Sequence, residues 1–355
     1  MNITYILGNG FDIQLGLKSR YSDFLAEYVK PKSGDTINIR KFKRYLRERP
    51  NCEWWSDAEK AMGKDLGRFS DRTIEIYREQ LINFQDELAS YLEKQESICD
   101  FSEEGQLRKR FIEFLIESFN GIEDVTYRRT PLPNIEFRFI SFNYTSLIDK
   151  LLKCCMENGG VSIYKGTEYT TRQDKLGMLC HVHGDLNSQI IMGVNDESQL
   201  VMNHELTLNN EIRWQFLKGE MSRALRWKRD RTAKSLIERS NIIVMYGVSY
   251  GETDARWWEE VVKWLESDTR HRIVAFIYEE NSDMHSRVPC IRINYEKEKK
   301  KEILKRFGVS ENSIYFEMLE KQIYIEDATK DLNLRELIRP EEAIAAMNAT
   351  NKNEV

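Results

Sequence analysis

Short apolar runs recur along the chain and indicate the strands of a sheet. Each run combines aromatic and β-branched residues over the length of a strand, and a Gly-x-Gly turn ends the first one. Each is followed, at once or after an intervening stretch, by a helical pattern, as expected of a parallel sheet covered by helices. The four runs are Asn2 to Leu7, Phe137 to Phe142, Ile242 to Tyr246 and Ile273 to Tyr278.

The stretch between the first two strands has a helical period. Apolar residues recur at steps of three and four from Ile74 to Tyr91, and every four residues from Leu107 to Phe119. Each segment therefore carries one apolar stripe along a helix. We interpret residues 36–130 as an all-helical insertion, and we favour core packing over a coiled-coil surface for its apolar stripes.

These patterns predict one sheet domain that is interrupted by the helical insertion. Residues 1–35 and 131–310 are expected to form an α/β, Rossmann-like domain whose parallel sheet has helices on both faces. Residues 311–355 are expected to form a C-terminal extension, disordered from Asn348 onward. The Lys- and Glu-rich segment Glu296 to Arg306 is typical of a solvated helix face.

Composition and charge narrow the class of protein. The 355 residues are 41% hydrophobic and 31% charged, which excludes disordered and repetitive chains. A formal charge of −5 disfavours overall electrostatic attraction to nucleic acid. Nucleic acid would therefore bind only at a local basic patch. No apolar run approaches the roughly 20 residues that cross a bilayer, and the six cysteines lack zinc-knuckle spacing. We expect a reduced, cytoplasmic protein that does not bind membranes.

Glycines follow the first strand in the sequence Gly8-Asn9-Gly10-Phe11-Asp12. Glycines here let the backbone approach a ligand and turn its amides toward phosphate at the positive end of a helix. The third glycine of the dinucleotide fingerprint is missing, because Gly16 follows Gly10 by six residues. A tight structural turn explains the two glycines equally well.

Two further blocks place polar groups at the ends of strands. In Ser141 to Thr145, Asn143 stands where open α/β sheets bind ligands, although Asn also caps helices and forms turns. In Tyr246 to Asp254, Ser249 can donate to phosphate or ribose and Asp254 can accept from hydroxyls. Helix capping is the simpler role for Asp254 taken alone.

Two histidines lie two residues apart in the block Cys180 to Leu186, and in a strand they would share one face. A metal would need further ligands, and no recognisable set accompanies the pair, so we expect no metal. We interpret His183, beside the permissive Gly184, as a general base, and His181 as a structural histidine.

The segment Glu211 to Arg231 predicts one helix with aromatic residues among seven basic and three acidic ones. Such a composition can serve nucleic acid or a ligand pyrophosphate. We favour a surface helix whose Arg and Lys stems cover the core.

Together these blocks resemble the AbiH family, bacterial abortive-infection proteins that act against phage. The opening Ile6 to Asp12 is followed by Gly16-Leu17, Tyr21 and Asp23-Phe24, and the later motifs are Phe142 to Thr145, His181 to Gly184 and Gly247 to Asp254, in family order. The resemblance spans about residues 3–278. AbiH proteins resemble, more distantly, the sirtuin-like NAD-binding fold, which implies a sirtuin-like form of the sheet domain.

The sirtuin likeness implies roles for individual residues. Gly8 and Gly10 would form the NAD loop, Asn143 would hold a water or the ribose, and His183 would be the base. Ser249 would contact the adenosine side, whereas Tyr144-Thr145 departs from the residues that usually follow this Asn. The strand-end loops and this likeness together predict the cofactor-binding residues Gly8, Asn9, Gly10, Phe11, Asp12, Tyr144, Gly184, Gly247, Ser249 and Asp254.

The activity that the resemblance implies is hydrolysis of NAD to nicotinamide and ADP-ribose by an anti-phage effector. Protein deacylation is disfavoured because the four-cysteine zinc module of sirtuin deacylases has no counterpart in the cysteine spacing. One alternative is a sensor that binds a nucleotide without turnover and signals through the helical insertion. A nuclease toxin using the two histidines and the basic segment is the other. A homo-oligomer or a partner defence protein is the expected assembly.

Overall fold

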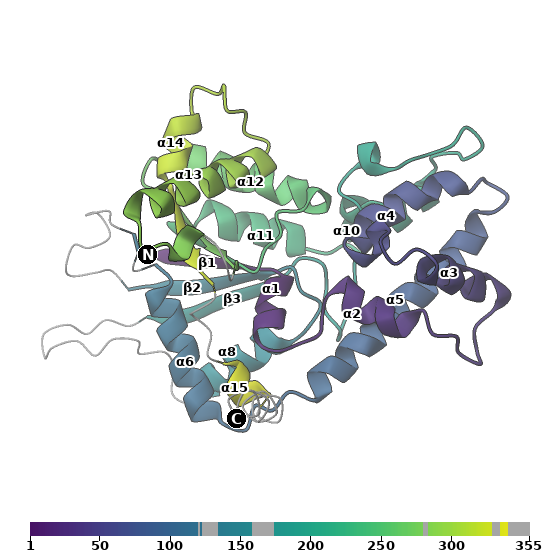
Figure 1. Cartoon of the computed structure of the whole chain (residues 1–355), viewed down its shortest axis with the longest axis horizontal. Coiled ribbons are helices and arrows are strands. Elements are labelled where there is room, and N and C mark those ends of the chain that lie inside the picture. Colours follow the sequence, from purple (N-terminus) through teal and green to yellow (C-terminus); the bar gives the residue numbers. More distant parts are fainter. Residues whose placement is uncertain (120, 123–133, 158–173, 280–282, 329–333, 340–355) are drawn as a thin grey trace, which may run out of the picture.

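Six parallel strands form one sheet in the order β3-β2-β1-β4-β5-β6 (Figure 1). This computed structural model describes residues 1–119, 121–122, 134–157, 174–279, 283–328 and 334–339. The strand order is that of the Rossmann fold, so the predicted α/β, Rossmann-like class is confirmed. The strands are β1 (Asn2–Leu7), β2 (Glu136–Ser141), β3 (Lys175–His181), β4 (Ile242–Tyr246), β5 (Arg272–Ile277) and β6 (Ile323–Asp327).

Helices cover both faces of the sheet, because alternate residues of each strand point to opposite sides. Tyr5 and Leu7 of β1 pack toward one helical layer, and Ile6 packs toward the other. The first layer contains α1 (Asn9–Gln14), α6 (Glu104–Glu117), α8 (Leu147–Glu157) and α15 (Arg335–Ile338). The second contains α11 (Arg229–Glu238), α12 (Ala255–Ser267), α13 (Pro289–Arg306) and α14 (Phe316–Lys321), on the opposite side of the sheet in Figure 1.

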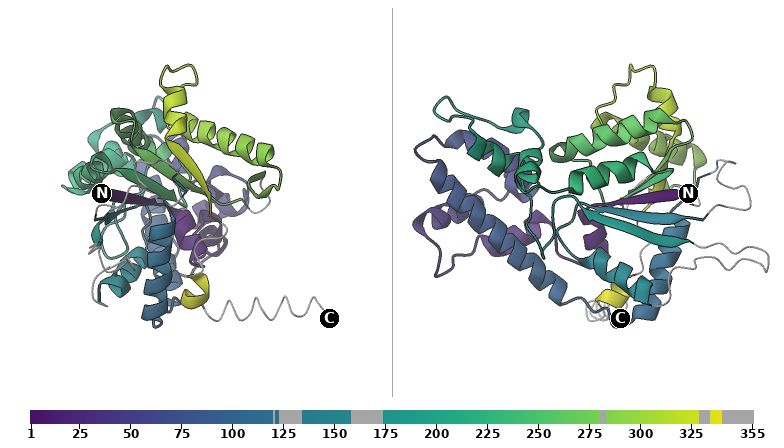
Figure 2. Two further views of the ribbon diagram at one scale, coloured as in Figure 1. Left: turned by 90° about the vertical axis from the view of Figure 1, so that its left-hand side faces the viewer. Right: turned by 180° about the vertical axis from the view of Figure 1, so that it is seen from behind.

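The remaining helices form a separate layer, here called the helical lobe, beside the carboxyl end of the sheet (Figure 2). Its core joins residues 24–92 with residues 192–217. Two segments of chain therefore build the lobe, in place of the single insertion 36–130. The helices are α2 (Tyr21–Tyr28), α3 (Ile37–Arg47), α4 (Ala58–Asp65), α5 (Ile74–Ser97), α9 (Asn210–Phe216) and α10 (Lys218–Ala224).

Two predicted helices occur where the periodicity indicates them. The apolar stripe from Ile74 to Tyr91 is buried along α5, and Leu107, Phe111 and Leu115 are buried along α6. However, α6 packs against the sheet and not within the lobe. At the far end of α5, Glu96 accepts hydrogen bonds from Ser146 and Lys150, so this helix ties the lobe to the start of α8.

Other expectations need correction. The segment Glu211 to Arg231 is divided among three helices, because the backbone is extended at Leu217 and Arg226 has a φ of 53°. Strand β6 lies within residues 311–355 and completes the sheet, so this region is more than an extension. The end from Asn348 lies outside the described residues. No helix in the described part of the chain is both long and apolar enough to span a membrane.

Candidate functional site

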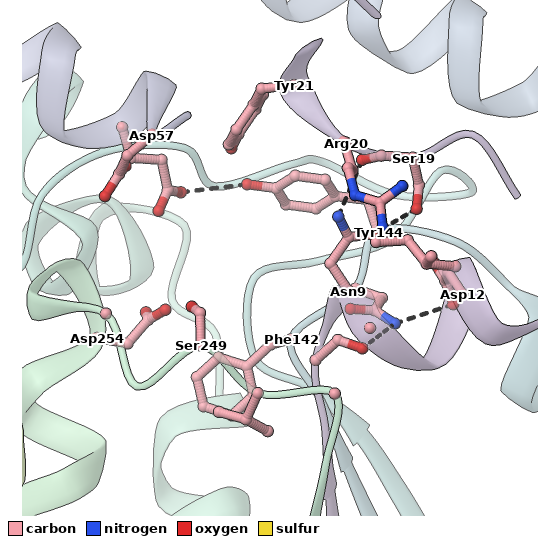
Figure 3. A pocket seen from close by; sticks show the side chains of 18 of the residues that line it. Asn9, Asp12, Ser19, Arg20, Tyr21, Asp57, Phe142, Tyr144, Ser249 and Asp254 are labelled. Carbon is pink, nitrogen blue, oxygen red and sulfur yellow. Dashed lines mark hydrogen bonds between the residues drawn. The ribbon is translucent and has the colours of Figure 1, made fainter. Parts of the chain in front are cut away.

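A cavity of about 670 Å³ lies at the carboxyl end of the sheet, between the strand-end loops and the helical lobe (Figure 3). It sits beside β1 and β4, the switch point of the strand order where Rossmann-like folds bind ligands. The predicted site residues that line it are Gly8, Asn9, Gly10, Asp12, Asn143, Tyr144, His183, Gly247, Ser249 and Asp254.

Glycines form the floor of the cavity by bringing two loops into backbone contact. A Cβ on Gly8 would lie 2.5 Å from the carbonyl oxygen of Gly247, and a Cβ on Gly10 would lie 2.5 Å from the Cα of Gly247. The amide of Gly8 donates to the carbonyl of Tyr246, and that of Gly10 donates to the carbonyl of Gly247. Both amides are thus engaged within the protein, and the tight-turn interpretation explains the geometry of both glycines.

Asn143 joins the loops after β1 and β2. Its amide nitrogen donates to the carbonyl oxygen of Gly8 at 3.1 Å and to the carboxylate of Asp12 at 2.9 Å. The hydroxyl of Thr145 donates to the other oxygen of Asp12 at 2.6 Å. Because both acceptors fix the orientation of the amide, the amide oxygen of Asn143 is the atom left to accept from a ligand.

Asp12 is a buried carboxyl at the cavity wall, with an exposed fraction of 2%. Burial raises its pKa to about 7, although the hydrogen bonds from Thr145 and Asn143 act in the opposite direction. The group therefore changes charge near neutral pH, which is typical of functional sites.

The two histidines do not share a pocket. Strand β3 ends at His181, so the alternation of a strand no longer applies at His183. His181 contacts the carboxylate of Asp149 at 2.9 Å and the carbonyl of Asn143 at 3.1 Å. Burial acts to lower the pKa of His181, but the hydrogen bond and charge of Asp149 outweigh it and raise the pKa. Its contacts are those of a structural histidine.

His183 lines the cavity and faces a buried carboxylate. Its Nε2 lies 2.8 Å from Oδ1 of Asp254, although the groups are not aligned as a regular hydrogen bond. Its Nδ1 is buried and has no hydrogen-bond partner among the described residues. Buried polar atoms nearly always have a partner, so the unpaired Nδ1 is an exception at this site that calls for an explanation.

A buried lysine extends this contact into a network of four ionisable side chains. The Nζ of Lys218 lies 2.8 Å from Oδ1 of Asp254 and 2.8 Å from Oε2 of Glu59. Glu59 comes from α4 in the helical lobe, and Lys218 begins α10. Asp254 is the N-cap residue of α12, as the capping interpretation placed it, but its side chain makes no cap hydrogen bond and contacts Lys218 instead.

Charges in this network shift one another's pKa. Burial acts to raise the pKa of Asp254, but Lys218 and His183 outweigh it and hold the pKa well below its ordinary value. Burial raises the pKa of Glu59, and Lys218 offsets only part of that effect. For Lys218 burial acts to lower the pKa, but the two carboxylates raise it. Lys218 and Asp254 are therefore an ion pair at neutral pH.

Aromatic rings form a second wall of the cavity. Phe142 stacks on Trp258 with ring centroids 5.5 Å apart and meets the ring of His183 edge-on at 5.2 Å. The hydroxyl of Tyr144 donates to Glu59 at 3.3 Å and to the carbonyl of Ile191 at 3.1 Å. Figure 3 shows the ring of Tyr144 between the acidic groups and the loop of Asn9. Such walls suit a planar ring or base.

Cationic groups lie at the rim. Arg20 and Arg306 line the cavity and are exposed, and Arg306 donates to the carbonyl of Ser249. The side chain of Asn9 is held by two hydrogen bonds to Ser19. The cavity thus has a basic rim and an acidic inner wall.

Some site residues were missed by sequence reasoning, and two predicted ones lie elsewhere. Phe11 is buried in the core against Tyr246. Gly184 forms a turn with a φ of 83° and does not line the cavity. Glu59 and Lys218 were not predicted. Each is a charged residue three positions before a buried methionine on a helix, and this charge on an apolar stripe is the signal that the sequence offers.

Across the described residues, no three His, Cys, Asp or Glu side chains gather in a way that could hold a metal ion.

A family model matches the chain over residues that include the loops of this site. No curated protein matches the chain. The model of the family described as bacteriophage abortive infection AbiH matches residues 4–278, well over half of the sequence and including every loop at the cavity floor. The chain therefore belongs to the AbiH family of bacteriophage abortive infection proteins, and this membership implies a role in anti-phage defence.

Proposed function

We propose that the cavity binds NAD and hydrolyses it to nicotinamide and ADP-ribose during abortive infection. The observation that carries the proposal is the buried, unpartnered Nδ1 of His183 beside Asp254, in a cavity at the switch point of a Rossmann-ordered sheet. A base held by a carboxylate next to a dinucleotide-sized cavity suits the activation of water. The sirtuin likeness remains a prediction.

Phosphates would contact the rim more than the floor. The amides of Gly8 and Gly10 already donate to backbone carbonyls, so the diphosphate would rely on Arg20, Arg306 and the hydroxyl of Ser249. The nicotinamide ring would then lie deeper, against Phe142 and the acidic wall.

The reaction needs few groups from the protein. The bond between C1′ of the ribose and the pyridinium nitrogen breaks with both electrons going to the ring, which leaves as neutral nicotinamide. Water forms the new bond to C1′ and gives its proton to Nδ1 of His183, from which it passes to solvent. The amide oxygen of Asn143 holds the water or a ribose hydroxyl, and the carboxylates favour the positive charge on the sugar.

Infected cells provide the test, with NAD measured alongside survival of the culture. We expect NAD to fall when phage infects cells that carry the wild-type protein, and free nicotinamide to rise. His183→Ala and Asn143→Ala should each slow the loss by about 100-fold or more. His204→Ala is the matched control, because this histidine is 92% exposed in its side chain and does not line the cavity. Defence by both site variants without any fall in NAD would refute the catalytic proposal.

A second candidate is a nucleotide sensor without turnover. It is favoured by the fact that the cavity is lined from both the strand-end loops and the helical lobe, so that a ligand would contact both. The sensor predicts NAD or ADP-ribose binding, no product, and defence that survives His183→Ala. Self-association or a partner defence protein stays a prediction under either function. The nuclease alternative stays a prediction; of its two histidines only His183 lines the cavity, and His181 is engaged with Asp149.

A further inference from the structure

The network of Glu59, Lys218, Asp254 and His183 is costly to bury. The side chains of Lys218 and His183 are 2% and 4% exposed, and those of Glu59 and Asp254 are 10% and 17% exposed. Well-packed apolar residues generally stabilise a fold as well as a buried ion pair does. A charge network that adjoins a cavity therefore suggests a role beyond stability.

Lys218 stands behind the cavity wall and not on it. Glu59, Asp254 and His183 line the cavity, whereas Lys218 does not. Its Nζ contacts the same oxygen of Asp254 that faces Nε2 of His183. Lys218 can therefore influence a ligand only through its two carboxylate partners.

We propose that Lys218 is a positioning residue, which keeps Asp254 as an ionised acceptor, so that the neutral form of the His183 ring carries its proton on Nε2. Nδ1 then has a free lone pair for the ligand or for the attacking water. Glu59 of the helical lobe also contacts Lys218. The lobe therefore helps to set the tautomer of His183, which lies just after strand β3. The consequence for turnover rests on the proposed function, but the position of the proton does not.

Electrostatics supports this assignment. Removing Lys218 would leave the carboxylates of Glu59 and Asp254 buried near each other without their common cation, and like charges in one site favour protonation of one of them. A protonated Asp254 would donate to Nε2, and the ring proton of His183 would move to Nδ1. Tyr144 and Tyr21 also lie within electrostatic range of Glu59 and Asp254, and Asp57 lies within range of Tyr21.

Both variants of Lys218 test the proposal in the full-length protein. Lys218→Met removes the charge at similar volume, and Lys218→Gln keeps a donor for one carboxylate if the first variant does not fold. Imidazole ¹⁵N shifts of histidine-labelled protein report the tautomer, and the signals of His183 are those lost in His183→Gln. We expect the proton on Nε2 in the wild type and on Nδ1 in the folded Lys218 variants, with NAD turnover lowered about 100-fold or more.

Lys43→Met is the matched control. Lys43 is a lysine of the helical lobe, buried to the same degree, whose Nζ lies 2.8 Å from Asp35 and which does not line the cavity. Its removal should lower stability and leave the tautomer of His183 and the turnover per folded molecule unchanged. A folded Lys218 variant that keeps the proton of His183 on Nε2 would overturn the positioning role. Loss of the Nε2 tautomer in a protein that never consumes NAD would overturn the proposed function and leave the role of Lys218 standing.

Discussion

Replacing Gly10 by alanine tests whether the glycines of the first loop serve packing. The new Cβ would lie 2.5 Å from the Cα of Gly247 and 3.1 Å from its carbonyl carbon and oxygen. These are backbone atoms, which cannot rotate away as a side chain can. The loops after β1 and β4 would have to separate, and the 2.9 Å hydrogen bond from the amide of Gly10 to Gly247 would lengthen.

Two terms set the size of the effect. Forcing an extra carbon into a tightly packed site costs about 1–3 kcal/mol. Loss of the backbone hydrogen bond adds about 0.5–1.5 kcal/mol. We therefore expect Gly10→Ala to lower the free energy of unfolding by about 1.5–4.5 kcal/mol, even with no ligand present.

Urea unfolding followed by tryptophan fluorescence measures this difference, with Gly105→Ala as the matched control. Gly105 lies in α6, and a Cβ there would meet no atom within 4 Å. The same substitution at this position should raise stability by about 0.5–1 kcal/mol, because alanine is the better helix former. If Gly10→Ala is as stable as the wild type and loses only ligand binding, the packing argument is wrong and close approach of a phosphate explains this glycine.

Three further outcomes follow from the described contacts. Burial raises the pKa of Asp12 from 3.8 to about 7, so ionisation of this carboxyl lowers the free energy of unfolding by about 4 kcal/mol between pH 4 and pH 8. Asp12→Asn should reduce the pH dependence of stability by this amount, as urea titrations at both pH values will show. Cys290 is exposed, whereas burial raises the pKa of Cys155 to about 12 and that of Cys180 to about 11. A maleimide should therefore modify Cys290 first and the other two only on unfolding, as read by mass spectrometry of peptides. Phe111→Ala should lower stability by about 3–5 kcal/mol, because the ring is 1% exposed in the sheet core; a cost below 1 kcal/mol would show that α6 does not pack there.

The central strands could be predicted because burial on both faces makes them continuously apolar. The runs ending at Leu7 and Tyr246 become β1 and β4 with the expected bounds. The edge strands lack that signal. In β3, Gly177 and the exposed Met178 interrupt the pattern, and β6 is five residues long and ends in Glu326-Asp327.

The site could be predicted only as far as it lies on strand ends. Asn143, His183 and Asp254 follow strands and converge as expected, since parallel strands bring their carboxyl ends to one edge. Glu59 and Lys218 meet only through the packing of the helical lobe, 159 positions apart in the chain. No local pattern encodes a contact of that range.

The central position of β1 also has a consequence for synthesis on the ribosome. Ile3 pairs with Phe137 on one side and with Ile242 on the other, so the first strand made has both neighbours only after β4 has been made. At translation rates of about 5–20 residues per second, roughly 10–50 s separate β1 from β4. Gly247 and Asp254 follow β4, so a nascent chain has neither the floor of the cavity nor the partner of His183. A fragment truncated before residue 254 is therefore expected to lack the complete site, and ligand binding by such a fragment would contradict this expectation.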